Sequence, residues 1–445
     1  MSPSRDDPRA HGGPRENAGR TVITRIEKLA PTGEGVARTE DGVGFVDRVL
    51  PGELVETILY ERRSRFWRGS PRRILEPSPD RIESAHAGCG GCDWAHYAQA
   101  ASRAAKRELF LETMQRIGHL GTADLGVVEP PAASGPGYRL RLRLHVSGAG
   151  DAARVGYFAP GTHRVVDAAS CEAVAPSTRA GFSEIRDAIA ESGIAASELA
   201  ILEDLPGTRR LFRLTESGPA GGASGEARLA ERLLSGFDGV LLRSAEGTVR
   251  LDRGRRRLAL EVGGRRFLVS VDAFFQGNRH LVGSLMADVR DEAGRVPAGT
   301  ALDAFGGAGL FAGALLDAGH EVTSVERDLE ASEDARATRA EWPDGGRWTA
   351  KAATIAEFLH ADDREFDVVV VDPPRAGLGA GLAEELGRRA RRLFLYVSCD
   401  PATLARDLGA LRTGRSGLAI ARARLYDLFA FTHRVETLVV LERRS

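Results

Sequence analysis

Two side chains with chemical potential stand at the ends of apolar segments in the last quarter of the chain. Cys399 ends the segment LFLYVSC, and Pro401 prevents that strand from continuing. Asp372 ends the segment DVVVVD, 27 residues earlier, and two prolines follow it. A thiolate at the carboxyl end of a strand is accessible for nucleophilic attack, although a free cysteine more often packs as a small apolar residue. The pattern makes Cys399 a candidate nucleophile beside a pocket that Asp372 faces.

A glycine-rich turn predicts a cofactor pocket near these residues. The segment ALDAFGGAGLF (301–311) places its glycines after a short strand and before a helix, where the backbone can approach a ligand closely. Glu326 ends the next predicted strand, 17 residues after Gly309, and its carboxylate can accept both hydroxyls of a ribose. No basic residue stands near to neutralise a pyrophosphate, so a nucleoside cofactor without phosphates, such as S-adenosylmethionine, fits better.

Three other cysteines stand outside this region: Cys89 and Cys92 in AGCGGCD, and Cys171 in AASCEA. Four cysteines in 445 residues cannot form a disulfide framework. In a reducing compartment, a closely spaced pair favours metal binding.

The elements that must position these residues change character along the chain. From residue 269 onward, apolar strands alternate with amphipathic helices, which is typical of a parallel sheet with ligands at the carboxyl ends of its strands. Residues 20–77 show short alternating runs broken by Gly and Pro, which predicts a small β-barrel. The expected fold class is α/β: a Rossmann-like C-terminal domain, an N-terminal small β-barrel and a central α+β domain. The expected divisions are a disordered tail (1–17), the barrel (18–77), the central domain with the cysteine loop (78–100 and 136–268) and the catalytic domain (101–135 and 269–445).

The net charge hides a local concentration of arginine. Lys+Arg 61 and Asp+Glu 62 leave a formal charge of -1, which gives no overall attraction to nucleic acid. Residues 62–73, however, contain six arginines around Phe66 and Trp67. Such a strand could grip phosphates and stack on bases, or it could be a solvated edge strand guarded by charge. A second basic face is predicted on a strand that carries Arg139, Arg141 and Arg143.

Nothing in the sequence suggests contact with a membrane. The apolar runs are far shorter than the roughly 20 residues that span a bilayer, and the first residues, MSPSRDDPRAHGG, contain no apolar signal region. We therefore expect a cytoplasmic protein, and a monomer.

The motifs together resemble those of the bacterial S-adenosylmethionine-dependent RNA uracil-C5 methyltransferases, which make 5-methyluridine. DxFxGxG, DPPRxG, SCDPxTLxRD and DLFxxTxxVExLVVL occur here in the family's order and spacing. The resemblance extends over nearly the whole chain and implies a class I methyltransferase domain preceded by a TRAM-type RNA-binding barrel. It makes Cys399 the nucleophile and Glu436 the general base. It also implies that S-adenosylmethionine contacts Gln276, Phe305, Glu326 and Asp372.

The chemistry explains why such an enzyme needs both a thiol and a carboxylate. Carbon 5 of uracil is a poor nucleophile, but addition of a thiolate at carbon 6 makes carbon 5 enolate-like. After methyl transfer, carbon 5 still carries a proton, which a positioned base must remove before the thiolate can leave. The resemblance further implies that the target base leaves its stack, which costs least in a loop.

Many members of this family bind a 4Fe-4S cluster through four cysteines, and here the set is incomplete. Cys89, Cys92 and Cys171 match three of the ligands, whereas Glu83 stands at the place of the first and His86 lies nearby. Since such a cluster usually needs four protein ligands, three interpretations remain. Another ligand completes a cluster, the three cysteines hold a labile one, or the thiols only pack the loop.

Other functions are also compatible with these motifs. RNA cytosine-C5 methyltransferases typically carry a second cysteine beside the DPP motif, where this chain has Arg375. A non-catalytic RNA-binding or folding factor with a vestigial methyltransferase domain is a third reading, and Leu310, where relatives commonly have Asn, would suit it. The barrel and the cysteine loop favour ribosomal RNA over transfer RNA as the substrate, by analogy.

Overall fold

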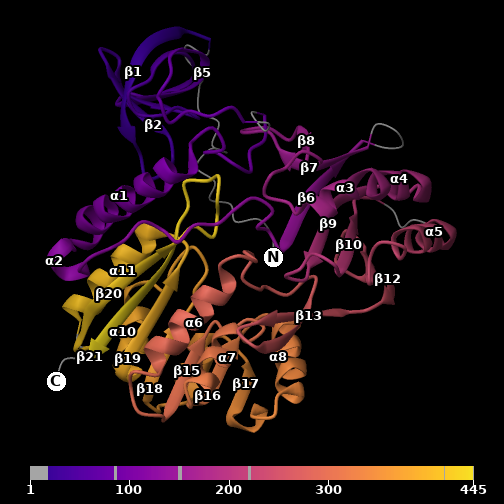
Figure 1. The fold of residues 1–445 in the computed structure, drawn as a ribbon, viewed down its shortest axis with the longest axis vertical. Coiled ribbons are helices and arrows are strands. Elements are labelled where there is room, and N and C mark those ends of the chain that lie inside the picture. Colours follow the sequence, from indigo (N-terminus) through magenta and orange to yellow (C-terminus); the bar gives the residue numbers. More distant parts are fainter. Residues whose placement is uncertain (1–18, 85–87, 149–152, 219–221, 415, 444–445) are drawn as a thin grey trace.

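The structure is a computed structural model, and it describes residues 19–84, 88–148, 153–218, 222–414 and 416–443. The predicted tail (1–17) and His86 lie outside the described residues. The described residues form a barrel, a central mixed sheet, a two-stranded hairpin and a C-terminal sheet covered by helices, in that order along the chain (Figure 1). The predicted α/β class with an N-terminal barrel is therefore confirmed.

The N-terminal barrel closes because its first strand pairs with both the second and the fourth. Trp67 is fully buried in the barrel core, and a Cβ on Gly44 would lie only 2.0 Å from its ring. The strands, in their order around the barrel, are β1 (Thr21–Leu29), β2 (Gly35–Thr39), β3 (Gly42–Val46), β5 (Phe66–Glu76) and β4 (Leu54–Arg62).

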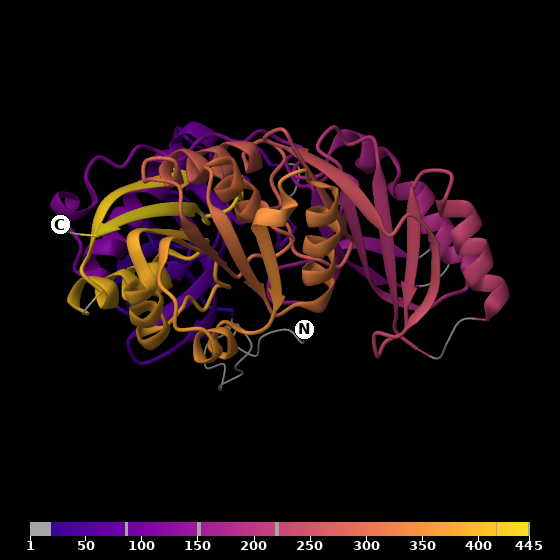
Figure 2. The ribbon, with the colours of Figure 1, turned by 90° about the horizontal axis from the view of Figure 1, so that it is seen from below.

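The central sheet alternates buried apolar residues with outward polar ones, and its helices pack in the same core. Figure 2 shows this region extending to one side of the C-terminal sheet. Its strand order is β12 (Val249–Gly254), β11 (Gly239–Arg243), β10 (Arg210–Glu216), β9 (Ala196–Glu203), β6 (Arg141–Ser147), β7 (Arg154–Phe158) and β8 (Val165–Asp167). Its helices are α3 (Pro176–Ala180), α4 (Phe182–Ser192) and α5 (Ala223–Leu233).

The C-terminal sheet is parallel except for β21, the last strand in the sequence, which runs antiparallel to both of its neighbours. Its order is β17 (Trp348–Ala352), β16 (Glu321–Glu326), β15 (Thr300–Ala304), β18 (Phe366–Val371), β19 (Ala390–Ser398), β21 (Glu436–Arg443) and β20 (Leu418–Tyr426). The connecting helices are α7 (Leu310–Asp317), α8 (Leu329–Glu341), the 3₁₀ turn η2 (Gly345–Arg347), α9 (Ile355–Ala361), α10 (Ala380–Arg389) and α11 (Pro401–Thr413). Parallel strands bring their carboxyl ends to one edge, where ligands bind in such sheets.

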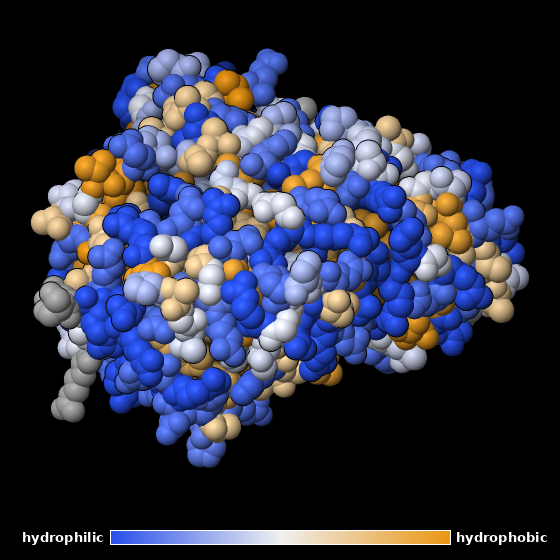
Figure 3. Space-filling view, turned by 60° about the horizontal axis from the view of Figure 1, so that its bottom comes forward, coloured by the Kyte–Doolittle hydropathy of each residue, from blue (hydrophilic) through white to orange (hydrophobic). Residues whose placement is uncertain are grey.

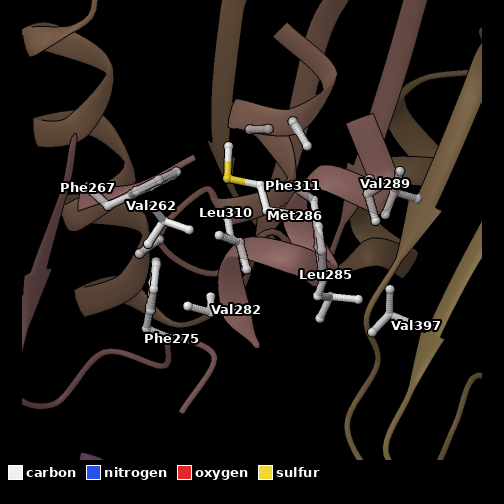
Figure 4. Packing of buried hydrophobic residues seen from close by; sticks show 14 of the residues in the cluster. Val262, Phe267, Phe275, Val282, Leu285, Met286, Val289, Leu310, Phe311 and Val397 are labelled. Carbon is white, nitrogen blue, oxygen red and sulfur yellow. The ribbon is translucent and has the colours of Figure 1, made fainter. Parts of the chain in front are cut away.

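Two apolar cores cover the faces of this sheet. On one face, α1 (Gln99–Gly118) and the short α2 (Thr122–Leu125) pack with α10 and α11. On the other, the hairpin β13 (Arg257–Val262) and β14 (Arg265–Ser270) packs with α6 (Val282–Ala293) and α7. Figure 4 shows side chains of this second core: Val262, Phe267, Phe275, Val282, Leu285, Met286, Val289, Leu310, Phe311 and Val397.

The surface suits a protein surrounded by water. The face in Figure 3 carries hydrophilic residues over most of its area, and its apolar residues are scattered singly or in small groups. Among the described residues, no helix combines the length and the apolar character that crossing a membrane requires.

Candidate active site

The glycine-rich turn after β15 has backbone angles that few residue types adopt easily. Phe305 has a left-handed φ of 64°, which is rare for an aromatic residue and concentrates at functional sites. Gly309 follows with φ +98°, and a Cβ there would lie 2.3 Å from the Trp348 ring. Glycine is therefore required at 309 both for its backbone angle and for the close approach of the indole.

Glu326 is held against this turn. The backbone N–H of Gly307 donates to Glu326 Oε2 at 3.1 Å, and that of Asp328 donates to Oε1 at 2.7 Å. These bonds orient the carboxylate at the carboxyl end of β16, beside the turn, as the sequence predicts for a ribose ligand.

Asp372 begins the loop after β18 and joins the same pocket. Gln276 Nε2 donates to Asp372 Oδ2 at 2.9 Å, which brings together two predicted cofactor contacts that lie 96 residues apart. Burial raises the pKa of Asp372 to about 7, with the Gln276 hydrogen bond opposing the rise and the Glu326 carboxylate adding to it.

Asp303, in the glycine motif, is a further member of this carboxyl cluster, and the sequence alone assigned it no role. Its side chain is fully buried, and burial followed by the charge of Asp372 raises its pKa to about 8. The pocket thus gathers Asp303, Glu326 and Asp372, an arrangement that suits a ligand with hydrogen-bond donors or positive charge. The signal that could have marked Asp303 was its place at the end of an apolar strand.

Cys399 and Glu436 come together through strand pairing. Ser398, at the end of β19, pairs with Thr437 in the antiparallel β21. Continuing that register by one residue sets Cys399 opposite Glu436, although 37 residues separate them in sequence. The structure therefore brings the predicted nucleophile and the predicted base to the same point on the sheet edge.

Glu436 is an isolated buried carboxyl group. Its side chain is 2 % exposed, and Oε1 has no hydrogen-bond partner among the described residues. Burial, and then the Asp372 carboxylate, raises the pKa of Glu436 well above its ordinary value. When it is ionised, a carboxylate with a raised pKa is a stronger base, which suits proton abstraction.

The Cys399 thiol is only half-buried, and its surroundings oppose ionisation. Burial raises its pKa to about 12, and the carboxylates of Glu436 and Asp372 add to the rise. The guanidinium of Arg375 acts in the opposite direction. At neutral pH the group is a thiol, so its proton must be removed during attack.

The three other cysteines lie in one region, where the described residues show no group of three potential metal ligands. All three are buried, and Cys92 and Cys171 belong to the apolar core of the central sheet. Burial raises the pKa of Cys92 to about 12, and a neighbouring thiolate at Cys171 would raise it further. Glu83, at the place of the missing ligand, is exposed, and the described residues contain no group of three potential metal ligands. The described residues therefore do not fit an iron–sulfur cluster, and that hypothesis gains no support.

The arginine-rich strand of the barrel differs from the prediction. Trp67 lies in the core, where it cannot stack on a base, and its Nε1 donates to Thr39. Five of the six arginines form ion pairs with carboxylates of the barrel itself, because strands rich in acids lie alongside. These pairs are Arg62–Asp41, Arg63–Glu61, Arg68–Glu34, Arg72–Glu56 and Arg73–Glu56.

The arginines of the second predicted basic face also contact other groups of the protein. Arg141 donates to the carbonyl oxygens of Asp272 and Ala273, at 2.8 and 2.7 Å, and Arg143 pairs with Glu198. Arg139 lies near the rings of Tyr138 and Tyr157. Both segments are rich in arginine, but most of these side chains are paired with carboxylates or carbonyl oxygens of the protein itself.

Comparison with known proteins gives this geometry a context. The family model described as tRNA (Uracil-5-)-methyltransferase matches residues 354–444, the segment that contains Cys399 and Glu436. The whole fold is similar to that of the tRNA (uracil-54, C5)-methyltransferase of Pyrococcus abyssi, solved in complex with S-adenosyl-L-homocysteine. The TM-score is 0.72 at 21% identity, covering 94% of this chain and 100% of the other.

Relatives with higher identity span nearly the whole chain. An RNA methyltransferase of Streptomyces avermitilis is 32% identical, covering 95% of this chain and 98% of the relative. The 23S rRNA (uracil(1939)-C(5))-methyltransferase RlmD of Halomonas elongata is 31% identical, covering 94% of this chain and 88% of the relative. With similarity of this extent, and a matching family model over its catalytic segment, the chain belongs to the RNA uracil-C5 methyltransferase family.

Proposed function

We propose that the protein transfers a methyl group from S-adenosylmethionine to carbon 5 of a uridine in RNA, through a covalent bond between Cys399 and carbon 6. The observation that carries this proposal is the strand register that sets Cys399 opposite the buried Glu436. A thiol alone could only add to the base, and a carboxylate alone could not activate it. Their juxtaposition supplies both halves of the reaction.

The pocket fits the proposed methyl donor. Glu326 is oriented at the glycine turn, where it can accept hydrogen bonds from a ribose. Phe305 and Asp372 flank the same turn, and the hydrogen bond from Gln276 holds Asp372 in place. When bound, S-adenosylmethionine supplies an electrophilic methyl group and a positive charge, which a pocket rich in carboxyl groups favours.

Cys399 acts in the first half of the reaction and Glu436 in the second. The half-buried Cys399 thiol passes its proton to solvent, and Sγ bonds to carbon 6 while the electron pair of the 5,6 double bond moves toward carbon 5 and the O4 carbonyl. Once carbon 5 carries the methyl group, Glu436 takes the remaining proton from carbon 5. The electron pair of that C–H bond reforms the double bond, and the thiolate leaves carbon 6.

We further propose ribosomal RNA as the substrate. The relative from Halomonas elongata is named for a uridine of 23S rRNA, and it aligns with this chain from the barrel through the catalytic domain. The solved archaeal structure is of a tRNA enzyme, so transfer RNA is the alternative.

Mapping 5-methyluridine in RNA from a deletion strain tests the function and the substrate together. We expect one mark in 23S rRNA to disappear and to return when the gene is restored, but not when the gene encodes Cys399→Ala. Loss of a tRNA mark would overturn the choice of ribosomal RNA. An unchanged set of 5-methyluridines, or a lost 5-methylcytidine, would overturn the proposed reaction.

A further inference from the structure

Two arginines flank Cys399 at the carboxyl edge of the C-terminal sheet. Arg375 lies in the loop after β18, and its carbonyl oxygen accepts a hydrogen bond from Thr403 Oγ1 at 3.1 Å, which ties that loop to the first turn of α11. Arg434 lies two residues before Glu436, and its backbone N–H donates to Thr432 Oγ1 at 3.2 Å. The strands β18, β19 and β21 are neighbours, and the charges of Arg375, Arg434 and Cys399 act on one another, so the three side chains lie close together.

Neither guanidinium has a partner within the described part of the chain. Their side chains make no hydrogen bond or ion pair there, whereas most arginines of the barrel strand and of β6 are paired. Arg375 is exposed, and Arg434 is half-buried. A partly buried guanidinium without a partner is unfavourable unless a ligand accepts its hydrogen bonds and balances its charge.

The acids nearby are already engaged. Asp93 accepts hydrogen bonds from the backbone N–H and the ring of His433. Asp400 caps α11 by accepting from the N–H groups of Ala402 and Thr403, at 3.0 and 2.9 Å. Asp372 holds Gln276 on the cofactor side of the pocket. These three carboxylates are hydrogen-bonded to other groups, and none of them forms an ion pair with Arg375 or Arg434, although the charges of Asp93 and Asp400 act favourably on Arg434.

The arginines also repel each other. Burial lowers the pKa of Arg434, and the positive charge of Arg375 lowers it further. An anion placed between the two would relieve this repulsion. In a methyltransferase acting on RNA, the anion that must arrive at this place with every substrate is a backbone phosphate.

We propose that Arg375 and Arg434 form a binding site for the phosphodiester of the nucleotide whose uracil reaches Cys399. This inference rests on the proposed role of Cys399. A guanidinium presents a planar fork of N–H donors that matches phosphate oxygens. Held by this pair, the backbone would keep the target base beside the thiol while it is out of its stack. Most of the arginines predicted from the sequence to bind RNA form ion pairs with carboxylates of the protein, whereas these two have no such partner among the described residues.

The test is the salt dependence of RNA binding, measured by fluorescence anisotropy with a labelled single-stranded oligouridylate. Each phosphate contact in a single strand contributes about 0.7 to the slope of log affinity against log salt concentration. We expect Arg375→Ala and Arg434→Ala each to weaken binding about fivefold to tenfold and to lower the slope by about 0.7. The double variant should lower it by about 1.4, and Arg375→Lys should retain most of the slope.

Two controls separate this site from a general loss of positive charge. Arg336 in α8 is also exposed and unpaired among the described residues, but it lies toward the β17 edge of the sheet. Arg72 in the barrel is paired with Glu56. Arg336→Ala and Arg72→Ala should leave the slope unchanged, and thermal unfolding should show that every variant is folded.

Equal losses in the Arg336 or Arg72 variants, or an unchanged slope in the double variant, would overturn the proposal. So would a double variant that binds RNA normally and loses affinity for S-adenosylmethionine, since the pair would then serve the carboxylate of the methyl donor. Binding of RNA does not require methylation. A Cys399→Ala protein should therefore bind with the full slope, and failure of the proposed reaction would leave this result intact.

Discussion

The cysteines of the central domain and Cys399 differ in their surroundings far more than in their acidity. Burial raises the pKa of both Cys92 and Cys399 to about 12. Cys92 packs in an apolar core, whereas Cys399 is half-buried at a strand end, opposite Glu436 and close to Asp372. The comparison teaches that access and neighbouring acid–base groups, rather than the acidity of the thiol alone, make a cysteine chemically useful.

The cysteine loop serves to connect parts of the molecule. The N–H of Gly90 donates to the Phe158 carbonyl in β7, and the N–H of Trp94 donates to the Phe431 carbonyl, both at 2.9 Å. Trp94 Nε1 donates to the Gly33 carbonyl in the barrel at 2.9 Å. The loop thus joins the barrel and the central sheet to the segment that precedes Glu436.

The largest expected effect follows from removing the thiol of the proposed nucleophile. Cys399→Ala should lower the rate of RNA methylation by roughly a thousandfold or more, because no adduct can form at carbon 6. With RNA containing 5-fluorouridine, whose fluorine cannot be removed as a proton is, the wild-type protein should form an adduct stable to denaturation and the variant none. Methylation by the variant at the wild-type rate would contradict the conclusion that Cys399 differs from the central cysteines by acting as the nucleophile.

Glu436→Gln should separate addition from release. The amide cannot take the proton from carbon 5, so turnover should fall by roughly a hundredfold or more, and methylated RNA should remain attached to Cys399. Denaturing electrophoresis with a radiolabelled methyl group would detect this species. The double variant with Cys399→Ala should not accumulate it, and full turnover by Glu436→Gln would exclude Glu436 as the base.

Asp372 should make binding of S-adenosylmethionine depend on pH. Because its pKa is raised to about 7, the carboxylate forms as pH rises through neutrality and is lost as pH falls. The affinity measured by calorimetry should therefore be about tenfold weaker at pH 6 than at pH 8. Asp372→Asn should bind weakly at both values. A wild-type affinity that does not change with pH would contradict this role.

The smallest effect is expected at the three central cysteines. Replacing Cys89, Cys92 and Cys171 with alanine should leave the methylation rate within about twofold of the wild-type rate. The loss of buried thiols should lower the free energy of unfolding by the amount expected for small cavities. Protein purified anaerobically should contain no stoichiometric iron and show no absorbance band near about 400 nm, which iron–sulfur clusters display. Stoichiometric iron in the wild-type protein, lost in the triple variant, would restore the cluster hypothesis.

The sequence by itself determined the kind of fold and one edge of the site. Continuous apolar strands followed by helices specify a parallel sheet, and such a sheet brings the residues after its strands to one edge. That rule placed Asp372 and Cys399 at the ends of β18 and β19, and Glu326 at the end of β16. The glycine turn was also predicted, from glycines placed between a strand and a helix, and the structure adds that a Cβ at position 309 would lie 2.3 Å from the Trp348 ring.

Tertiary structure alone decided which side chains meet. The meeting of Cys399 and Glu436 depends on the register between β19 and β21, and sequence spacing does not specify a register between strands so far apart. Likewise, composition counts arginines but does not show their partners. The barrel pairs most of its arginines with carboxylates, whereas Arg375 and Arg434, at the edge where Cys399 lies, form no ion pair among the described residues. Charge acts through distance and burial, which only the folded chain defines.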